Sequence, residues 1–193
     1  MTILFVLGAA AGLVGDHAHV VTGTTEYFTS AVPFLWSSPV WFPVLVGLAT
    51  VSLAELRLHL PRPRTHVTAR QALAGVAAVI GTYVVTALVH AAPAVPANAL
   101  ICALAVITWC VLGDGPAAVC GALAALIGPA VEIGLVEVGV FRYVETCDQL
   151  LGVGPWLVPL YFAFGVVAAL LGELCLRWGA SPRRGPSGAA ALP

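Results

Sequence analysis

The sequence predicts an all-α integral membrane protein, built as a bundle of six transmembrane helices. Of its 193 residues 60% are hydrophobic and only 9% are charged, and the mean hydropathy is +1.00. So little polar surface cannot cover a globule of this size in water. The chain also divides into six apolar runs, each close to the ~20 residues that a helix needs to cross a bilayer. The net charge of -1 gives no reason to expect nucleic acid as a partner.

The first three expected helices cover residues 2–22, 40–58 and 71–91. The first run lacks the basic start of a secretory signal and exceeds a signal's apolar core, so we expect a retained helix. The second begins at Trp41, because an indole ring suits a membrane interface and the neighbouring prolines are tolerated in a first helical turn. The third begins after Pro61 and Pro63, which disfavour a continuing helix.

The last three expected helices cover residues 97–113, 117–138 and 156–176. The breaks before them contain Pro93 and Pro96, then Gly113-Asp114-Gly115-Pro116, then Gly152-Val153-Gly154-Pro155. Trp156 follows Pro155 directly, so we expect it, like Trp41, to anchor its helix entrance at the membrane interface. Pro129 lies inside the fifth helix, where it removes a backbone donor and should cause a kink. Residues 1–178 therefore form one transmembrane domain. Residues 179–193, rich in Pro, Gly, Ser and Ala, are expected to form a disordered cytoplasmic tail.

The arginines predict the orientation of the bundle. The chain has no lysine, and seven of its eight arginines lie either between residues 57 and 70 or after residue 176. With six spans both groups fall on one side of the membrane, which the positive-inside rule makes cytoplasmic. Both termini are therefore expected in the cytoplasm.

Two groups of polar residues lie within the expected spans. Asp16 and His19 are three residues apart and share a helix face, whereas Glu132 and Glu137 are about 140° apart around the fifth helix. Because an ionised side chain near the bilayer centre costs ~3 kcal/mol, such residues indicate either a functional site or interhelical hydrogen bonds. The functional alternatives are a pocket for a lipid headgroup and a small proton-coupled transporter that uses these four residues. A metal site on Asp16, His17 and His19 has the weakest signal, since its ligands should converge from several helices.

The cysteines and glycines carry little functional signal. The five cysteines form no C-x-x-C pair, so neither a metal nor a redox cofactor is expected. Gly8 and Gly12 form a G-x-x-x-G spacing on the first helix, which permits homo-oligomerisation.

Several motifs occur in the order and spacing of a known family. The start of the second expected helix reads Ser37-Ser38-x-x-Trp41-x-Pro43-x-x-x-Gly47-x-Ala49. The end of the fifth reads Gly139-Val140-Phe141-Arg142-Tyr143, and the sixth contains Trp156-Leu157 followed by Phe162-Ala163-x-Gly165. Together with Leu100 to Asp114, these motifs resemble the Insig family of sterol-responsive membrane proteins over residues 37 to 172.

The resemblance implies a non-enzymatic six-helix protein that binds an apolar lipid among its helices and senses it. It also places Asp114 where the family keeps an acidic residue for binding its escort partner. Some positions depart from the family: Ala97 stands where Insig proteins have a sterol-facing Gln, and Trp109 replaces a Trp pair. The use of Arg without any Lys, with a composition rich in Ala, Val and Gly, is typical of a bacterium with GC-rich DNA. We therefore expect a bacterial inner-membrane protein without the eukaryotic escort protein or HMG-CoA reductase as partners.

The expected ligand is one apolar lipid in a crevice between helices, entered beside the fifth helix. A sterol-like molecule fits the family, but diacylglycerol or an isoprenoid fits a bacterium better. The aromatic residues should supply apolar contact, and a protonated Glu132 should donate to a headgroup oxygen. The residues expected near the lipid are Trp41, Phe42, Trp109, Glu132, Phe141, Tyr143, Trp156 and Phe162.

Overall fold

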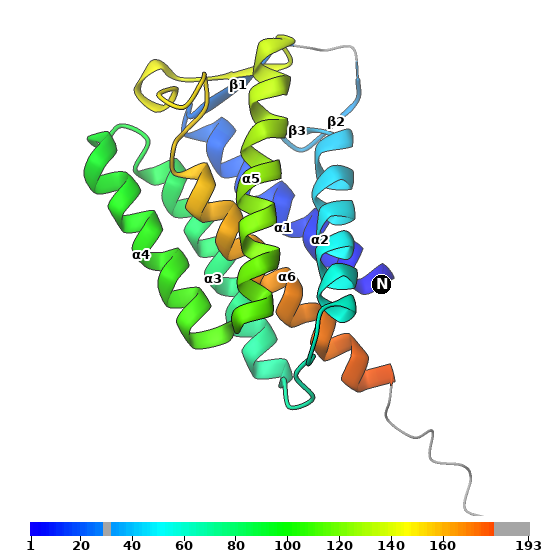
Figure 1. Ribbon diagram of the computed structural model, residues 1–193. Helices are drawn as coiled ribbons and strands as arrows, with labels where there is room; N and C mark the ends of the chain where they lie inside the picture. The colour runs from blue at the N-terminus through cyan, green and yellow to red at the C-terminus, as the bar shows by residue number, and fades with distance from the viewer. Residues whose placement is uncertain (29–31, 180–193) are drawn as a thin grey trace, which may run out of the picture.

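Six long helices dominate the part of the chain that the computed structural model describes, residues 1–28 and 32–179 (Figure 1). Each is long and apolar enough to cross a membrane, which confirms the predicted fold class. Their ends lie within three residues of the expected positions. The predicted disordered tail lies, apart from its first residue, outside the described residues. The helices are α1 (Thr2–Val21), α2 (Trp41–His59), α3 (Ala69–Leu88), α4 (Ala94–Leu112), α5 (Gly115–Glu137) and α6 (Leu157–Gly179).

Helix α6 is the centre of the bundle. In its membrane-spanning window 72% of the residues are buried, against 28–33% in the other five helices. It packs against α2, α3, α4 and α5. Two glycines permit the closest approaches: a Cβ on Gly165 would lie 2.5 Å from the Cys120 carbonyl oxygen of α5, and one on Gly172 would lie 2.7 Å from the Ala54 carbonyl oxygen of α2. Small residues therefore set how closely the helix backbones pack.

Four short strands occur among the described residues, all at one end of the bundle, which we call the strand end (Figure 1). Strand β1 (Thr25–Tyr27) pairs antiparallel with β4 (Phe141–Tyr143), and β2 (Phe34–Leu35) pairs antiparallel with β3 (Ser38–Pro39). A short 3₁₀ helix, η1 (Glu145–Cys147), follows β4. The sequence did not predict these strands, because two or three residues are too few to show an alternating pattern.

The opposite end, which we call the arginine end, is held by a network of four charged side chains. Arg57 of α2 lies 2.9 Å from the Asp114 carboxylate and 2.6 Å from the Glu173 carboxylate of α6. Arg64, in the loop between α2 and α3, donates from Nε to Glu173 at 2.9 Å. Asp114 also caps α5 by accepting from the Ala117 N–H at 2.8 Å. The network therefore ties α2, α5, α6 and one loop together.

Candidate functional site

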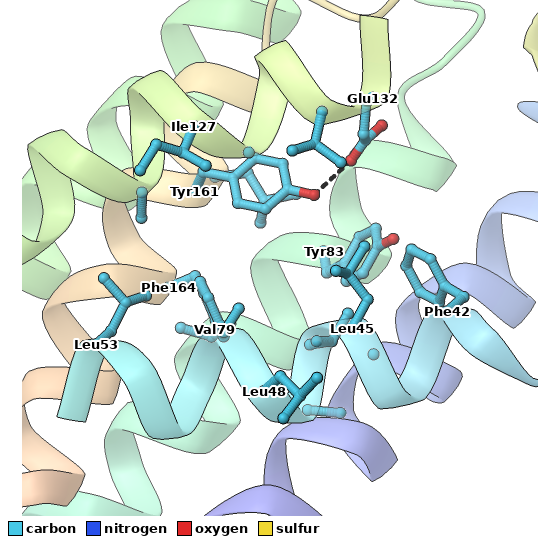
Figure 2. A pocket seen from close by; sticks show the side chains of 18 of the residues that line it. Phe42, Leu45, Leu48, Leu53, Val79, Tyr83, Ile127, Glu132, Tyr161 and Phe164 are labelled. Carbon is cyan, nitrogen blue, oxygen red and sulfur yellow. Dashed lines mark hydrogen bonds between the residues drawn. The ribbon is translucent and has the colours of Figure 1, made fainter. Parts of the chain in front are cut away.

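A cavity of about 410 Å³ lies inside the bundle and is lined almost entirely by apolar side chains (Figure 2). One wall is α2, which contributes side chains between Phe42 and Leu53; the facing wall is α5, which contributes side chains between Ala124 and Leu135. Helices α3 and α6 close the back with Val79, Tyr83, Leu160, Tyr161 and Phe164, among others. This volume is within the ~300–1,000 Å³ typical of small-molecule sites.

The cavity opens sideways, between α2 and α5. Leu45 and Leu48 of α2, with Ile127 and Val131 of α5, line the cavity and are also exposed on the outside of the bundle. The exposed outer faces of these helices are apolar, as a lipid-facing surface requires. The opening is therefore bordered by apolar side chains of both helices.

Glu132 supplies the main polar group of the cavity. It is buried, and its two carboxyl oxygens accept from two different tyrosines. The Tyr161 hydroxyl of α6 donates to Oε1 at 2.5 Å (Figure 2). The Tyr143 hydroxyl of β4 donates to Oε2 at 2.5 Å. Both carboxyl oxygens thus accept from tyrosine hydroxyls. Donation from Glu132 to a lipid headgroup, which the sequence led us to expect, stays a prediction.

The strand end of the cavity is closed by a second hydrogen-bonded group centred on Asp16 of α1. Its carboxylate accepts from the Tyr27 hydroxyl at 2.9 Å and from the Ser38 hydroxyl. Burial, and then the negative charge of Asp16, raise the pKa of Tyr27 above its ordinary value, so this hydroxyl keeps its proton. The Tyr27 ring also lies 5.6 Å from the ring of Phe141, which lines the cavity.

Four of the eight residues expected near the lipid meet at the closed end of the cavity. Phe42, Glu132 and Phe141 line it, and Tyr143 contacts Glu132 through its hydroxyl. These four come from α2, α5 and β4, so it is the packing of helices and loop that brings them together.

The other four expected residues lie outside the lining. Trp41 is half-buried against the ring of Phe42. Trp109 faces outwards and donates from Nε1 to the Asp114 carbonyl oxygen, and Phe162 packs against it. Trp156 is only 3% exposed and lies 5.1 Å from the ring of His19, so it is a core residue and not the interfacial anchor that its position beside Pro155 predicted. A helix entrance can lie below an overlying loop, and here residues 138–155 form one.

Two tyrosines that line the cavity were not predicted from the sequence: Tyr83 of α3 and Tyr161 of α6. Tyr161 lies in an otherwise apolar segment, where its isolated hydroxyl was the available signal, whereas Tyr83 lies between Thr82 and Thr86. The Ala97 position, where Insig proteins have a sterol-facing Gln, is buried but does not line the cavity.

The polar residues proposed for a proton relay or a metal site have separate partners. His19 bonds to Thr86 at 2.8 Å, His17 bonds to Ser37 at 2.7 Å, and Glu137 is exposed. Among residues 1–28 and 32–179, no group of three His, Cys, Asp or Glu side chains could hold a metal ion.

Comparison with known proteins gives matches along nearly the whole chain, although no family model matches it. A curated protein of Mycolicibacterium vanbaalenii, described as an INSIG protein homolog, is 70% identical over 184 residues, which cover 95% of this chain and 89% of that protein. The crystal structure of MvINS, a mycobacterial Insig homologue from Mycobacterium vanbaalenii, matches with a TM-score of 0.91 and 70% identity over 95% of both chains. A cross-linked, cysteine-substituted MvINS trimer matches with a TM-score of 0.91 and 68% identity, again over 95% of both chains.

Proposed function

This chain belongs to the Insig family, and we propose that it is a non-enzymatic membrane protein that senses one neutral lipid by holding it in the cavity between α2 and α5. The observation that carries the proposal is the shape and chemistry of this cavity. It has apolar walls, it opens sideways through α2 and α5, and its polar groups gather near Glu132. Such a site suits a long apolar molecule with a small polar head.

The polar end favours a head that carries a hydroxyl group. Each oxygen of a carboxylate offers about two acceptor positions, and the two tyrosines use one on each oxygen of Glu132. A ligand hydroxyl can therefore donate to a remaining position. An anionic phosphate would instead lose its hydration in a cavity whose lining, among the described residues, contains no Arg, Lys or His side chain to pair with it. Diacylglycerol, with one free hydroxyl and two apolar chains, fits these requirements best, and an isoprenoid alcohol or a sterol-like alcohol shares the same chemistry.

The proposal extends to assembly and orientation. One of the matching crystal structures is a cross-linked trimer of MvINS, and we extend self-association to this chain. We place the arginine end and both termini in the cytoplasm of a bacterial inner membrane, because the arginines gather there. Asp114 stays a predicted partner contact. Its carboxylate already accepts from Ala117 and Arg57, so a partner would compete with both.

The test is to identify the lipid that purifies with the protein. The chain is extracted in mild detergent, and the bound lipids are quantified by mass spectrometry. We expect about one neutral hydroxyl-bearing lipid per cavity. Ala49→Phe places a ring inside the cavity and should remove this lipid, whereas Val44→Phe, on an exposed part of the same helix that does not line the cavity, should keep it.

Glu132→Gln tests the polar end separately. It keeps the size of the side chain but replaces one acceptor oxygen with an N–H donor group, so we expect weaker retention of the hydroxyl lipid. Equal lipid content in the Ala49→Phe and Val44→Phe proteins, or no lipid near stoichiometric amounts in the unsubstituted protein, would refute the proposed function.

A further inference from the structure

A short hairpin between α1 and α2 presents large apolar side chains outwards. It consists of β2 and β3 joined by Trp36 and Ser37, and we call residues 33–40 the aromatic hairpin. Phe34, Leu35 and Trp36 are exposed, with Trp36 at 62%. Three neighbouring large apolar side chains on the surface of a small protein indicate a partner that covers them.

The aromatic hairpin is held in this arrangement by contacts with α1. The Trp36 ring stacks on the His17 ring with centroids 3.8 Å apart, and the Ser37 hydroxyl bonds to the same histidine at 2.7 Å. Ser38 is buried, and its hydroxyl donates to the Asp16 carboxylate. Trp36 also has a φ of 62°, a left-handed conformation that is unfavourable for a bulky residue. The fold therefore holds the indole outwards against a backbone preference, and such strain is often retained at a functional position.

The position of the aromatic hairpin in the bundle indicates what covers it. It lies beside the first turn of α2 and below the last turn of α5, at the level where the transmembrane helices end (Figure 1). Its exposed side chains continue from Val40 into Val44 and Leu48, which are exposed on α2. An indole combines a large apolar ring with one N–H donor, which suits the boundary between headgroups and acyl chains.

We propose that the aromatic hairpin is an interfacial anchor, which inserts Phe34, Leu35 and Trp36 into the headgroup–acyl boundary of the leaflet at the strand end. The occupant of this surface is the bilayer itself. The anchor lies directly before Phe42 and Leu45, which line the cavity, so it fixes the depth at which the mouth of the cavity meets the membrane. It is independent of which lipid the cavity holds.

The test measures the depth of an indole on the aromatic hairpin by fluorescence quenching. The full chain is reconstituted into phosphatidylcholine vesicles whose acyl chains carry bromine either near the headgroup or near the chain end. Leu35→Trp adds one indole at an exposed position, and subtracting the emission of the unsubstituted protein isolates its signal. Trp36→Phe is the complementary measurement, because it removes an indole while it keeps an apolar ring on His17.

Two reference variants define the scale. Leu126→Trp adds an indole on the exposed face in the middle of α5, and Gln149→Trp adds one in an exposed polar stretch of the strand end. We expect the shallow bromines to quench the added indole of Leu35→Trp at least about twofold more than the deep ones, with Leu126→Trp showing the reverse order. Water-soluble acrylamide should quench Gln149→Trp far more than Leu35→Trp.

Two results would overturn the anchor. If Leu35→Trp behaves like Gln149→Trp towards acrylamide, the aromatic hairpin lies in water. If neither bromines nor acrylamide quench it, a second copy or another protein covers this surface. The signal lost in Trp36→Phe must agree with the signal gained in Leu35→Trp, so the proposal stays testable if either variant fails to fold.

Discussion

The charged network at the arginine end makes a strong prediction for stability. Arg57 is 0% exposed and contacts two carboxylates, Asp114 at 2.9 Å and Glu173 at 2.6 Å. Replacing it with methionine, which keeps much of the volume, removes both ion pairs. Breaking a buried ion pair costs ~3–5 kcal/mol, because the remaining partner is left buried without its counter-charge. Here each carboxylate keeps another partner: Arg64 donates to Glu173, and Ala117 donates to Asp114. We therefore expect the lower end of the range, about 3 kcal/mol.

The assay is reversible unfolding in mixed micelles, followed by circular dichroism, on a double-mutant cycle. The cycle compares Arg57→Met, Glu173→Leu and the variant that carries both changes. Glu173 is also 0% exposed, so Glu173→Leu alone leaves Arg57 with only Asp114 as a charged partner. Removing both members of the pair leaves a smaller uncompensated charge than removing either alone. The double variant should therefore lose at least about 1 kcal/mol less than the sum of the two single losses.

Two results would refute this reasoning. A loss below about 1 kcal/mol for Arg57→Met would mean that the network contributes no more than an exposed ion pair. Additive losses in the cycle would mean that Arg57 and Glu173 do not depend on each other, despite the 2.6 Å between them. Arg64→Met provides the matched control, because this arginine is partly exposed and should cost less.

Two further predictions concern helix packing and pH. Gly165→Ala should destabilise the fold by ~1–3 kcal/mol, since its Cβ would lie 2.5 Å from the Cys120 carbonyl oxygen, whereas Gly81→Ala, with no atom within 4 Å, should stabilise it by ~0.5–1 kcal/mol. Equal unfolding midpoints for the two variants would contradict the close packing of α5 and α6. The free energy of unfolding should fall above pH ~10, because the folded chain keeps the Tyr27 proton that the unfolded chain loses. Tyr27→Phe should reduce this fall by about 1.4 kcal/mol per pH unit, and an unchanged pH profile would exclude Tyr27 as its source.

A residue of the candidate site was predictable where the adjacent sequence alone indicates that it is buried. It was less predictable where its role depends on residues that are distant along the chain. Glu132 was identified because a carboxylate in an apolar run is costly anywhere in a bilayer. Its two tyrosine partners lie 11 and 29 residues away along the chain, and no local pattern relates them. Trp156 shows the limit most clearly. Its neighbours along the chain suggested a membrane interface, but an overlying loop buries it against His19. Trp36, which no motif singled out, has an indole that is 62% exposed.

The sequence by itself determined that this chain is a six-helix membrane protein of the Insig type. Hydropathy, span length and the breaks at Pro and Gly are local properties, and the cost of exposing backbone polar groups to lipid leaves helices as the natural structure for such runs. Tertiary structure alone decided where the cavity lies, which side chains meet Glu132, and whether each described tryptophan side chain is buried or exposed. These features depend on how the helices rotate and tilt against one another. Side-chain packing sets rotation and tilt, and hydropathy is nearly blind to packing because lipid and protein interior are both apolar.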